Sequence, residues 1–518
     1  MFKKFINTIS KELAKLVEQA KSSQTLSLRR KNNIHLIDKK EDIDLEMSGV
    51  ASVGLEHGSF EQFAEEIDSE SEDIESAKES DKEMSQVGPD TSKKTGSVHS
   101  VRQRVLNTVN PLSDKRIYAD YASLTPIDPR VIRVVSEAMA EYTANPSSLY
   151  TEGVKAKKAL EDARLSVASH FGLNKDEVIF TSGGTEANNL AFYGLLSAFE
   201  TSELRKKLGS KAKPHIVIST IEHPSIIELS LALIEQGYDI SFVPVSASGI
   251  VDPRDIRKVL KPETILVSIM YANNEIGTIQ PIKEITREVR HFKKTIERSN
   301  QEYPFVHTDA SQAVLYEDMR IPGLNVDLMT IDGGKVYGPR GIGALLKRRY
   351  VPLVSMMHGG GQEAGLRPGT EHVAAVIGLK HALDIAHTEK DDEKARLKEL
   401  RETLIELLMS KINPILTTVS INGDIGARLP NNINICFPGL DAEFLVLRLD
   451  VLGLAVSSVT SCRGSDEDSS SYVIEALGKS DCALSSLRIT LGRNTTASDI
   501  GIIAERVAQA VREQVEQG

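Results

Sequence analysis

Cysteine is scarce in this sequence, with three among 518 residues. Cys436, Cys462 and Cys482 show no CxxC spacing, which is the arrangement typical of zinc sites and redox pairs. So few cysteines argue against a disulfide framework and against a zinc centre, and no metal site is expected. We therefore predict a protein of a reducing, cytoplasmic compartment, in which any special cysteine is a reactive one.

Positive charge is also in short supply, since 62 Lys and Arg stand against 73 Asp and Glu and leave a formal net charge of -11. Nucleic-acid binders neutralise phosphates with a basic surface, so we expect no nucleic-acid partner. No apolar run approaches the roughly 20 residues of a membrane span. The body of the chain is therefore expected to be soluble, with room for two or three domains.

The first 112 residues form an N-terminal extension that differs from the rest of the chain. In residues 1–20 apolar side chains recur at helical spacing with lysines on the other side, which predicts a basic amphipathic helix. Such a helix suits contact with an anionic membrane surface or a protein partner, organelle targeting, or solubility alone. Residues 38–90 are acidic and Ser-rich, so we predict a disordered linker.

Short apolar strands alternate with helical segments from about residue 116 onward. This alternation predicts an α/β fold whose large domain, residues 129–380, holds a mainly parallel seven-stranded sheet with helices on both faces. The strands are expected at residues 178–181, 215–220, 240–245, 264–270, 305–309, 326–331 and 343–346.

The pattern changes after about residue 378. A long charged helix is expected over residues 387–413 and a last helix from residue 497. Further strands are expected near residues 432–436, 454–456 and 486–491. These elements predict a smaller α+β C-terminal domain made of residues 113–128 and 381–518.

Lys335 follows two glycines directly after an expected strand, and Asp309 ends another one. Alone, a lysine in such a loop is more often a solvated surface charge. Together, a lysine able to form an imine and an aspartate able to hold a protonated pyridine are the two anchors of a pyridoxal phosphate (PLP) site.

A turn in residues 179–188 leads from an expected strand through small residues into an expected helix. Backbone N–H groups converge at such a helix start and favour an anion such as phosphate. The alternative is an ordinary loop capped by Ser182 or Thr185. The lysine and the aspartate in the same chain favour phosphate.

Cys462 lies in residues 457–466, a polar, Ser-rich stretch without periodicity, which predicts a mobile, exposed loop. A cysteine there can act as a thiolate nucleophile. Cys436 stands between apolar residues of an expected strand and is predicted to fill the core, whereas Cys482 is treated as incidental.

A family resemblance rests on eight short motifs. They lie at residues 118–126, 180–188, 222–223, 271–277, 307–312, 358–361, 367–370 and 491–493. In their order and spacing the chain resembles class V PLP-dependent enzymes, specifically cysteine desulfurases of the NifS/IscS type. The resemblance covers roughly residues 116–516 and implies the PLP-dependent transferase fold type I and a homodimer.

The resemblance implies a role around the cofactor ring for each matching residue. Lys335 would hold PLP covalently as an imine and later move protons. Asp309 would pair with the pyridinium nitrogen. Gln312 and Asn274 would hydrogen-bond near the ring oxygen, and His223 would stack on the ring and assist proton transfer.

The resemblance also implies residues for the phosphate and the substrate. Gly184 and Thr185 would cradle the phosphate, helped by Thr370 from a second subunit. Arg493, with Asn274, would bind the substrate carboxylate through a bidentate contact.

Cys462 matches the position that attacks the sulfur of bound L-cysteine in the family. The implied activity is therefore conversion of L-cysteine to L-alanine with a persulfide on Cys462, as a sulfur donor for iron-sulfur cluster or thio-cofactor synthesis. Alternatives are a class V aminotransferase, a selenocysteine lyase, or a catalytically decayed paralogue that acts through its extension. The sulfur acceptor stays open, because the chain ends at Gly518 without the tail by which bacterial housekeeping members dock their iron-sulfur scaffold.

Two positions beside Lys335 depart from the family's Ser-Gly-His-Lys. Gly334 removes a histidine donor, and Asp332 brings a negative charge toward a dianionic phosphate. Either Asp332 turns away to pair with a cation such as Arg340, or the affinity for the cofactor is reduced. The family's Gly-Ser-Ala-Cys is likewise replaced before Cys462, in a loop that is slightly longer.

Overall fold

The computed structural model describes residues 116–209, 211–458 and 470–517, all of which belong to one compact unit. The helix expected in residues 1–20, the linker expected in residues 38–90, and Cys462 lie outside the described residues. None of the helices within the described ranges combines the length and the apolar character needed to cross a membrane.

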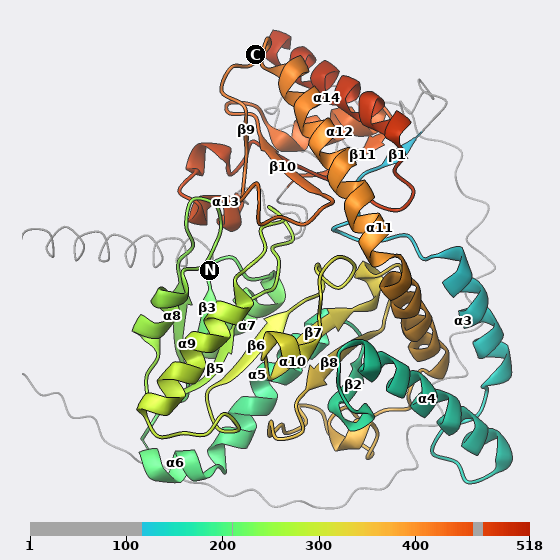
Figure 1. Cartoon of the computed structure of the whole chain (residues 1–518), viewed down its shortest axis with the longest axis vertical. Coiled ribbons are helices and arrows are strands. Elements are labelled where there is room, and N and C mark those ends of the chain that lie inside the picture. The colour runs from blue at the N-terminus through green and yellow to red at the C-terminus, as the bar shows by residue number, and fades with distance from the viewer. Residues whose placement is uncertain (1–115, 210, 459–469, 518) are drawn as a thin grey trace, which may run out of the picture. The chain divides into compact units, whose positions relative to one another are not determined.

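The largest sheet has seven strands in the order β2-β8-β7-β6-β5-β3-β4 (Figure 1). Only β8 runs antiparallel to its two neighbours, so the predicted mainly parallel sheet is confirmed. The strands are β2 (Val178–Thr181), β3 (His215–Ser219), β4 (Asp239–Val243), β5 (Thr264–Ser268), β6 (Phe305–Asp309), β7 (Leu328–Asp332) and β8 (Gly343–Lys347).

Helices cover both faces of this sheet, as predicted for parallel strands joined by crossovers (Figure 1). One face carries α5 (Gly184–Glu200) and α7 (Pro224–Glu235), which pack against each other. The other carries α8 (Pro253–Val259) and α9 (Ile282–Thr295), also packed together. Every residue of β2, β3, β5 and β6 is buried, which explains their continuous rather than alternating apolar sequences. Two shorter helices are α6 (Glu203–Leu208) and α10 (Ile321–Leu324).

A 40-residue helix, α11 (Val373–Ile412), packs on α3 (Pro129–Glu141), α4 (Thr151–His170) and the C-terminal α14 (Ala497–Gln517). The expected start at residue 387 was wrong, because the first turns of α11 are buried on several sides and show no polar face. The domain boundary expected between residues 380 and 381 falls inside this helix.

A second, antiparallel sheet has the order β12-β13-β10-β9. Its strands are β9 (Ser420–Ile421), β10 (Asn432–Cys436), β12 (Ser457–Ser458) and β13 (Ser486–Thr490). The single strand expected at residues 454–456 is two, since β11 (Leu454–Ala455) pairs in parallel with β1 (Ile117–Tyr118) instead. With α12 (Ala442–Val451) and α13 (Tyr472–Ala476), these elements form the expected α+β arrangement.

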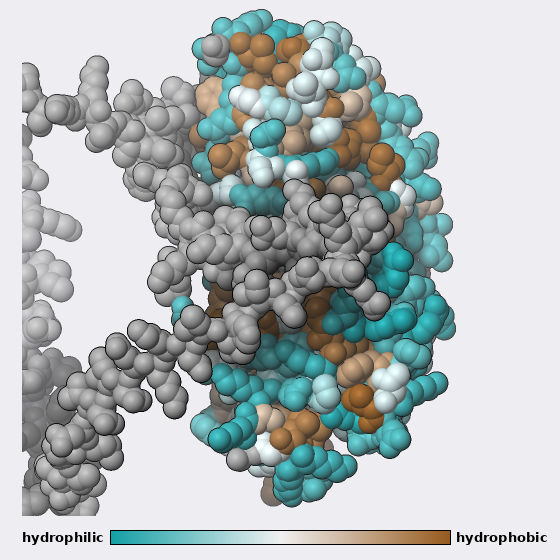
Figure 2. All heavy atoms as spheres, turned by 90° about the vertical axis from the view of Figure 1, so that its left-hand side faces the viewer, coloured by the Kyte–Doolittle hydropathy of each residue, from teal (hydrophilic) through white to brown (hydrophobic). Residues whose placement is uncertain are grey.

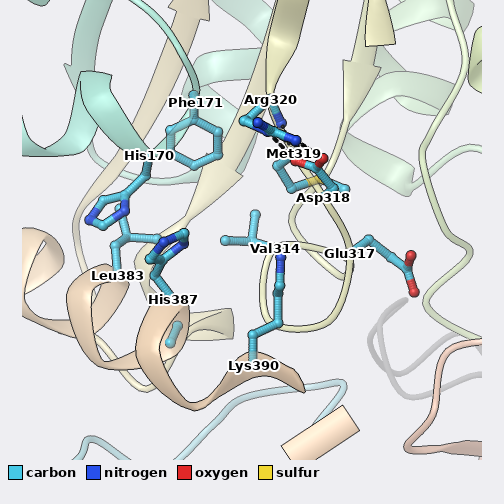
Figure 3. Close-up of a pocket in the computed structure, with 11 residues that line it drawn as sticks. His170, Phe171, Val314, Glu317, Asp318, Met319, Arg320, Leu383, His387 and Lys390 are labelled. Carbon is cyan, nitrogen blue, oxygen red and sulfur yellow. Dashed lines mark hydrogen bonds and ion pairs between the residues drawn. The ribbon is translucent and has the colours of Figure 1, made fainter. Parts of the chain in front are cut away.

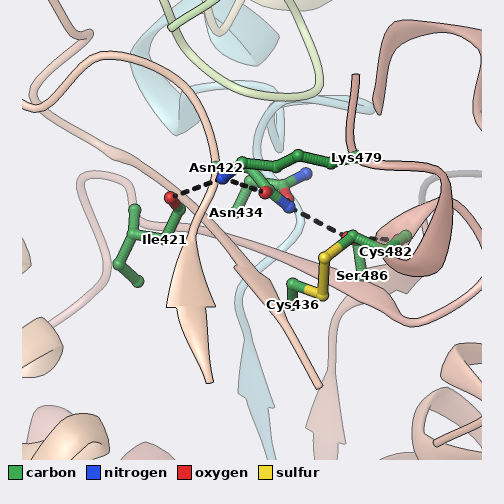
Figure 4. Close-up of a disulfide and its surroundings, with 7 residues drawn as sticks. All are labelled: Ile421, Asn422, Asn434, Cys436, Lys479, Cys482 and Ser486. Atoms are coloured by element: carbon green, nitrogen blue, oxygen red, sulfur yellow. Dashed lines mark hydrogen bonds between the residues drawn. A yellow bond between two sulfur atoms is a disulfide. The ribbon is translucent and has the colours of Figure 1, made fainter. Parts of the chain in front are cut away.

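Cys436 and Cys482 form a disulfide that joins β10 to the turn η4 (Ser480–Cys482), as Figure 4 shows. The prediction of unpaired cysteines was therefore wrong for these two. Asn422 stands beside the bond and donates to the side chains of Asn434 (2.8 Å) and Ser486 (2.9 Å). Disulfides are rare in reducing compartments. Cysteine usage therefore no longer supports the predicted cytoplasmic location.

The coloured residues in Figure 2 show patches of hydrophobic residues separated by hydrophilic ones on the face turned to the left of Figure 1. Such a mixture is usual for a protein surface, to which apolar atoms contribute about half or slightly more of the area.

Candidate active site

Several of the predicted site residues lie where the parallel strands end. Asp309 is the last residue of β6, and Lys335 lies in the short turn η2 (Gly333–Lys335) that follows β7. His223 follows β3 at the start of α7, and Asn274 follows β5. The carboxyl ends of neighbouring strands in open α/β sheets form the usual ligand crevice, so the sheet explains why these distant residues converge.

Lys335 is held under the segment that follows β1. Its Nζ donates to the carbonyl oxygens of Ala122 (3.0 Å) and Ser123 (2.5 Å). Thr125 fixes this segment to the lysine turn, because its N–H and its hydroxyl both donate to the Gly334 carbonyl, at 2.9 and 3.0 Å. The amine is therefore half-buried and oriented before any ligand arrives.

Asp309 is held by α5. Its Oδ2 accepts from the side chain of Asn188 at 2.9 Å, and its Oδ1 accepts from the Ser311 N–H at 3.0 Å. Asn188 is the last residue of the motif at residues 180–188, but no role was predicted for it. Its position four residues after Gly184, one turn into α5, is the signal that could have placed it under the carboxylate.

His223 is the N-cap of α7. Its Nδ1 accepts from the Ser225 N–H at 3.2 Å, so a neutral ring carries its proton on Nε2. Burial lowers the pKa of His223, and the positive charge of Lys335 lowers it further, whereas the carboxylates of Asp309 and Asp332 oppose the shift. The imidazole is thus neutral at neutral pH and presents an N–H donor.

Gln312 lies beside Lys335, since its Nε2 donates to the same Ala122 carbonyl oxygen at 2.9 Å. The structure therefore brings Gln312 to the predicted site. Its contact with the segment that also accepts from Lys335 places it at the same end of the crevice.

The arginine that reaches Asn274 is Arg488 of β13. Its Nη1 donates to the Asn274 carbonyl oxygen at 3.0 Å, and its Nη2 donates to the Ser123 hydroxyl at 2.6 Å and to Asp120 at 2.9 Å. Arg488 is buried, and its Nε has no partner among the described residues. Sequence reasoning missed this residue, which stands five positions before the arginine that was chosen.

Arg493 is not brought to Asn274, so the predicted pair was wrong. The Arg493 guanidinium stacks over the Tyr337 ring, 4.3 Å from its centroid, and pairs with Asp128 at 2.9 Å and Glu389 at 3.1 Å. Two carboxylates already neutralise this arginine. Its contacts tie the loop after Lys335 to α11 and to the start of α3.

The predicted phosphate end lies at the first residue of α5. The Gly184 N–H points at Asp332, whose Oδ2 accepts from it at 2.8 Å, while Oδ1 accepts from the Gly334 N–H at 2.8 Å. Asp332 therefore does not turn away toward Arg340, which is exposed. Thr185 is exposed at the same helix start.

Thr370 is exposed in the segment between η3 (Glu363–Gly365) and α11. A contact from Thr370 to the phosphate of a second subunit stays a prediction. Such a contact requires an accessible side chain, and this one is accessible.

Glu222 is fully buried directly before His223. It accepts hydrogen bonds from the Ser219 hydroxyl (2.5 Å) and the Met270 N–H (3.0 Å). Burial raises the pKa of this carboxyl to about 8, and the nearby charge of Asp309 acts in the same direction. A neutral acid thus lies beneath the candidate site.

A separate cavity of about 260 Å³ opens between the end of α4, residues 314–320 and α11 (Figure 3). The rings of His170 and His387 lie side by side there, with their centroids 5.1 Å apart. None of the residues predicted for the active site lines this cavity, so it is distinct from the crevice at the strand ends.

Comparison with known proteins gives consistent matches. Residues 117–503 match the family model described as aminotransferase class-V. A cysteine desulfurase IscS of Dictyoglomus turgidum is 38% identical over 402 residues, which are 77% of this chain and 96% of that protein. A selenocysteine lyase of Rattus norvegicus is 35% identical over 427 residues, which are 80% of this chain and 98% of that protein.

Solved structures of similar proteins agree with these matches. A NifS-like protein superposes with a TM-score of 0.68 at 30% identity, covering 76% of this chain and 99% of its own. A NifS-like protein from Rickettsia africae gives a TM-score of 0.64 at 30% identity with the same coverage.

Proposed function

Because this chain belongs to the aminotransferase class-V family, we propose that it is a PLP-dependent cysteine desulfurase. The observation that carries the proposal is the convergence of an amine, a buried carboxylate and a neutral imidazole, from Lys335, Asp309 and His223, at one edge of the sheet. Similar proteins over most of the chain bear the name cysteine desulfurase IscS, which supports this activity over others of the family.

The residues present fit PLP at the ring end. Asn188 Oδ1, Ser311 Oγ and Arg488 Nε are buried polar atoms without a partner among the described residues, and all three lie around the crevice. Buried polar groups are nearly always satisfied, so these atoms favour a polar ligand there. Asp309 would hold the protonated ring nitrogen and Lys335 the aldehyde carbon.

The cofactor, when bound, supplies an electron sink that weakens bonds around Cα of an amino acid. The chain supplies the proton carriers. Lys335, once its amine is free, can take the Cα proton on Nζ. His223 can give a proton from Nε2, because its Nδ1 is occupied as an acceptor.

Arg488 is proposed to bind the substrate carboxylate, with Asn274 beside it. Its guanidinium is buried, already oriented by Ser123 and Asp120, and has an unused N–H. A planar guanidinium fixed in this way matches a carboxylate in geometry and charge.

The sulfur of L-cysteine is proposed to pass to Cys462. The thiolate of Cys462 forms the new S–S bond, the C–S bond of the substrate breaks, and the carbon takes up a proton. Cysteine and a protein thiol thereby become alanine and a protein persulfide, with atoms and electrons balanced.

The proposal is tested by incubating the full-length protein with PLP and L-cysteine and measuring alanine. Wild type should form alanine, and Lys335→Ala and Cys462→Ala should not. Lys398→Ala, which changes an exposed lysine of α11, is the control and should match wild type. Alanine formation that persists in Cys462→Ala would refute the assignment of the sulfur acceptor. Turnover of L-selenocysteine without turnover of L-cysteine would favour a selenocysteine lyase instead.

We also propose a homodimer in which Thr370 of one subunit approaches the phosphate of the other. The exposure of Thr370 supports this proposal. The cytoplasmic location stays a prediction, which cysteine usage no longer supports. Light scattering coupled to gel filtration tests the dimer, and cell fractionation tests the location.

A further inference from the structure

The phosphate end of the crevice is already occupied by a carboxylate of the protein. Asp332 bridges two backbone N–H groups, that of Gly184 at the first residue of α5 and that of Gly334 in the lysine turn, each at 2.8 Å. The first N–H groups of a helix have no partner inside the helix and carry its positive dipole end, which is why they attract anions. Asp332 uses one of them.

The glycines around Asp332 show how closely the carboxylate fits. A Cβ added to Gly183 would lie 3.1 Å from Asp332 Oδ2, and a Cβ added to Gly184 would lie 3.4 Å from it. A side chain at position 334 would approach Asp332 Oδ1 to 3.1 Å and Leu124 Cδ1 to 2.8 Å. Three glycines thus leave the space in which this carboxylate sits.

Asp332 also has a reason to stay in place. It is the N-cap of η2, the turn that carries Lys335, so its Oδ1 contact organises the lysine itself. A ligand phosphate that approached α5 would meet a negative charge at the Gly184 N–H and would have to move it or accept its repulsion.

Not every donor at this end is used. The Ser311 hydroxyl is buried without a partner among the described residues, and it lies 3.4 Å from a Cβ built on Gly184. A phosphate therefore retains at least one favourable contact even while Asp332 keeps its position. We expect phosphate binding at this end to be weakened rather than abolished.

We propose that Asp332 is a specificity-determining residue that occupies the phosphate end of the crevice. It lowers the preference of the site for a phosphate-bearing cofactor over the same ring without its phosphate. The inference rests on the proposed function, since it takes the ring to be pyridoxal. It concerns only the ratio between two ligands, pyridoxal phosphate and pyridoxal.

The experiment measures the dissociation constants of PLP and pyridoxal for the full-length, cofactor-free protein, by absorbance titration without any substrate. A parallel calorimetric titration uses pyridoxine 5′-phosphate and pyridoxine, which lack the aldehyde and so do not depend on Lys335. Asp332→Ser vacates the carboxylate and offers a hydroxyl, whereas Asp332→Asn keeps the shape and removes the charge.

Asp332→Ser should raise the preference for the phosphate-bearing ligand by about 10- to 100-fold, as expected when a charged hydrogen bond no longer has to be displaced. Asp332→Asn should raise it by a smaller factor, because its single amide oxygen can still accept from one of the two N–H groups. Asp441→Ser is the matched control, since Asp441 also accepts from two backbone N–H groups but at the start of α12, and it should leave the ratio unchanged.

An unchanged ratio in Asp332→Ser, with both ligands bound, overturns the inference and leaves the proposed function intact. Failure of wild type and every variant to bind either ligand overturns the proposed function, and the inference falls with it. A rise in the preference for the phosphate-bearing ligand in Asp332→Ser, seen with both ligand pairs, supports the inference. The pyridoxine pair excludes an effect through the reactivity of Lys335.

Discussion

Replacing Glu222 by glutamine should remove a pH dependence from the stability of this protein. The Glu222 carboxyl is fully buried, and burial raises its pKa from 4.5 to about 8. Between these two values the folded protein holds a proton that the unfolded chain releases. The folded pKa is the higher one, so the stabilisation is fully present below pH 4.5 and is lost as the pH rises through about 8.

The magnitude follows from the size of the shift. Each pH unit inside this window lowers the free energy of unfolding by up to about 1.4 kcal/mol, so the full window corresponds to about 5 kcal/mol. At pH 7 about 3 kcal/mol of this has been lost. Glutamine stays uncharged at every pH and still accepts from the Ser219 hydroxyl and the Met270 N–H.

The assay is urea-induced unfolding of wild type and Glu222→Gln between pH 5.5 and 7.5. Over this range the free energy of unfolding of wild type should fall by about 2.5 kcal/mol relative to the variant. Glu137→Gln, a change on the exposed face of α3, is the control and should run parallel to wild type. If the Glu222→Gln line also runs parallel to wild type, Glu222 is already charged in the folded protein and the reasoning is refuted.

Three further predictions concern other contacts. Arg488→Lys should lower kcat/KM for L-cysteine by about 10- to 100-fold through loss of the guanidinium fork, and more than Arg493→Lys does; a larger effect at Arg493 would contradict the placement. Glu363→Gln should lower the free energy of unfolding by about 3 kcal/mol, because it removes the carboxylate that pairs with both Nη atoms of the buried Arg164 and leaves only the carboxylate of Glu161 at Nε; urea unfolding at pH 7 measures this. Removing the disulfide by Cys482→Ala should cost about 4 kcal/mol for a separation of 46 residues, and wild type in reductant should show the same loss of unfolding midpoint.

Sequence reasoning located the large sheet well, because its strands are short apolar runs with polar ends. Two of its strands, at residues 178–181 and 305–309, agree with the structure at both ends, as does the strand at residues 432–436 of the second sheet. The two-residue strand β9 carries too few residues for any pattern. The start of α11 was missed because buried helices lose the alternation of polar and apolar faces on which such predictions depend.

Site residues that directly follow strands could be predicted from the sequence. Residues whose position depends on how distant segments pack could not. Lys335, Asp309, His223 and Gln312 meet as expected. The choice between two arginines five residues apart depends on which side of a strand end faces the crevice, and no local pattern reports that. The Cys436–Cys482 pairing likewise depends on how two distant segments pack.

The continuity of α11 restricts how this molecule can move. At about 1.5 Å per residue, 40 residues make a rod roughly 60 Å long. Because the helix is continuous through residue 380, a swing of the C-terminal sheet at that residue would have to disturb hydrogen bonds of α11. A tilt of the whole rod by about two degrees would instead carry its far end by about 2 Å. Repacking of α3 and α4 against one end of α11 would therefore displace the other end of α11, beside α14.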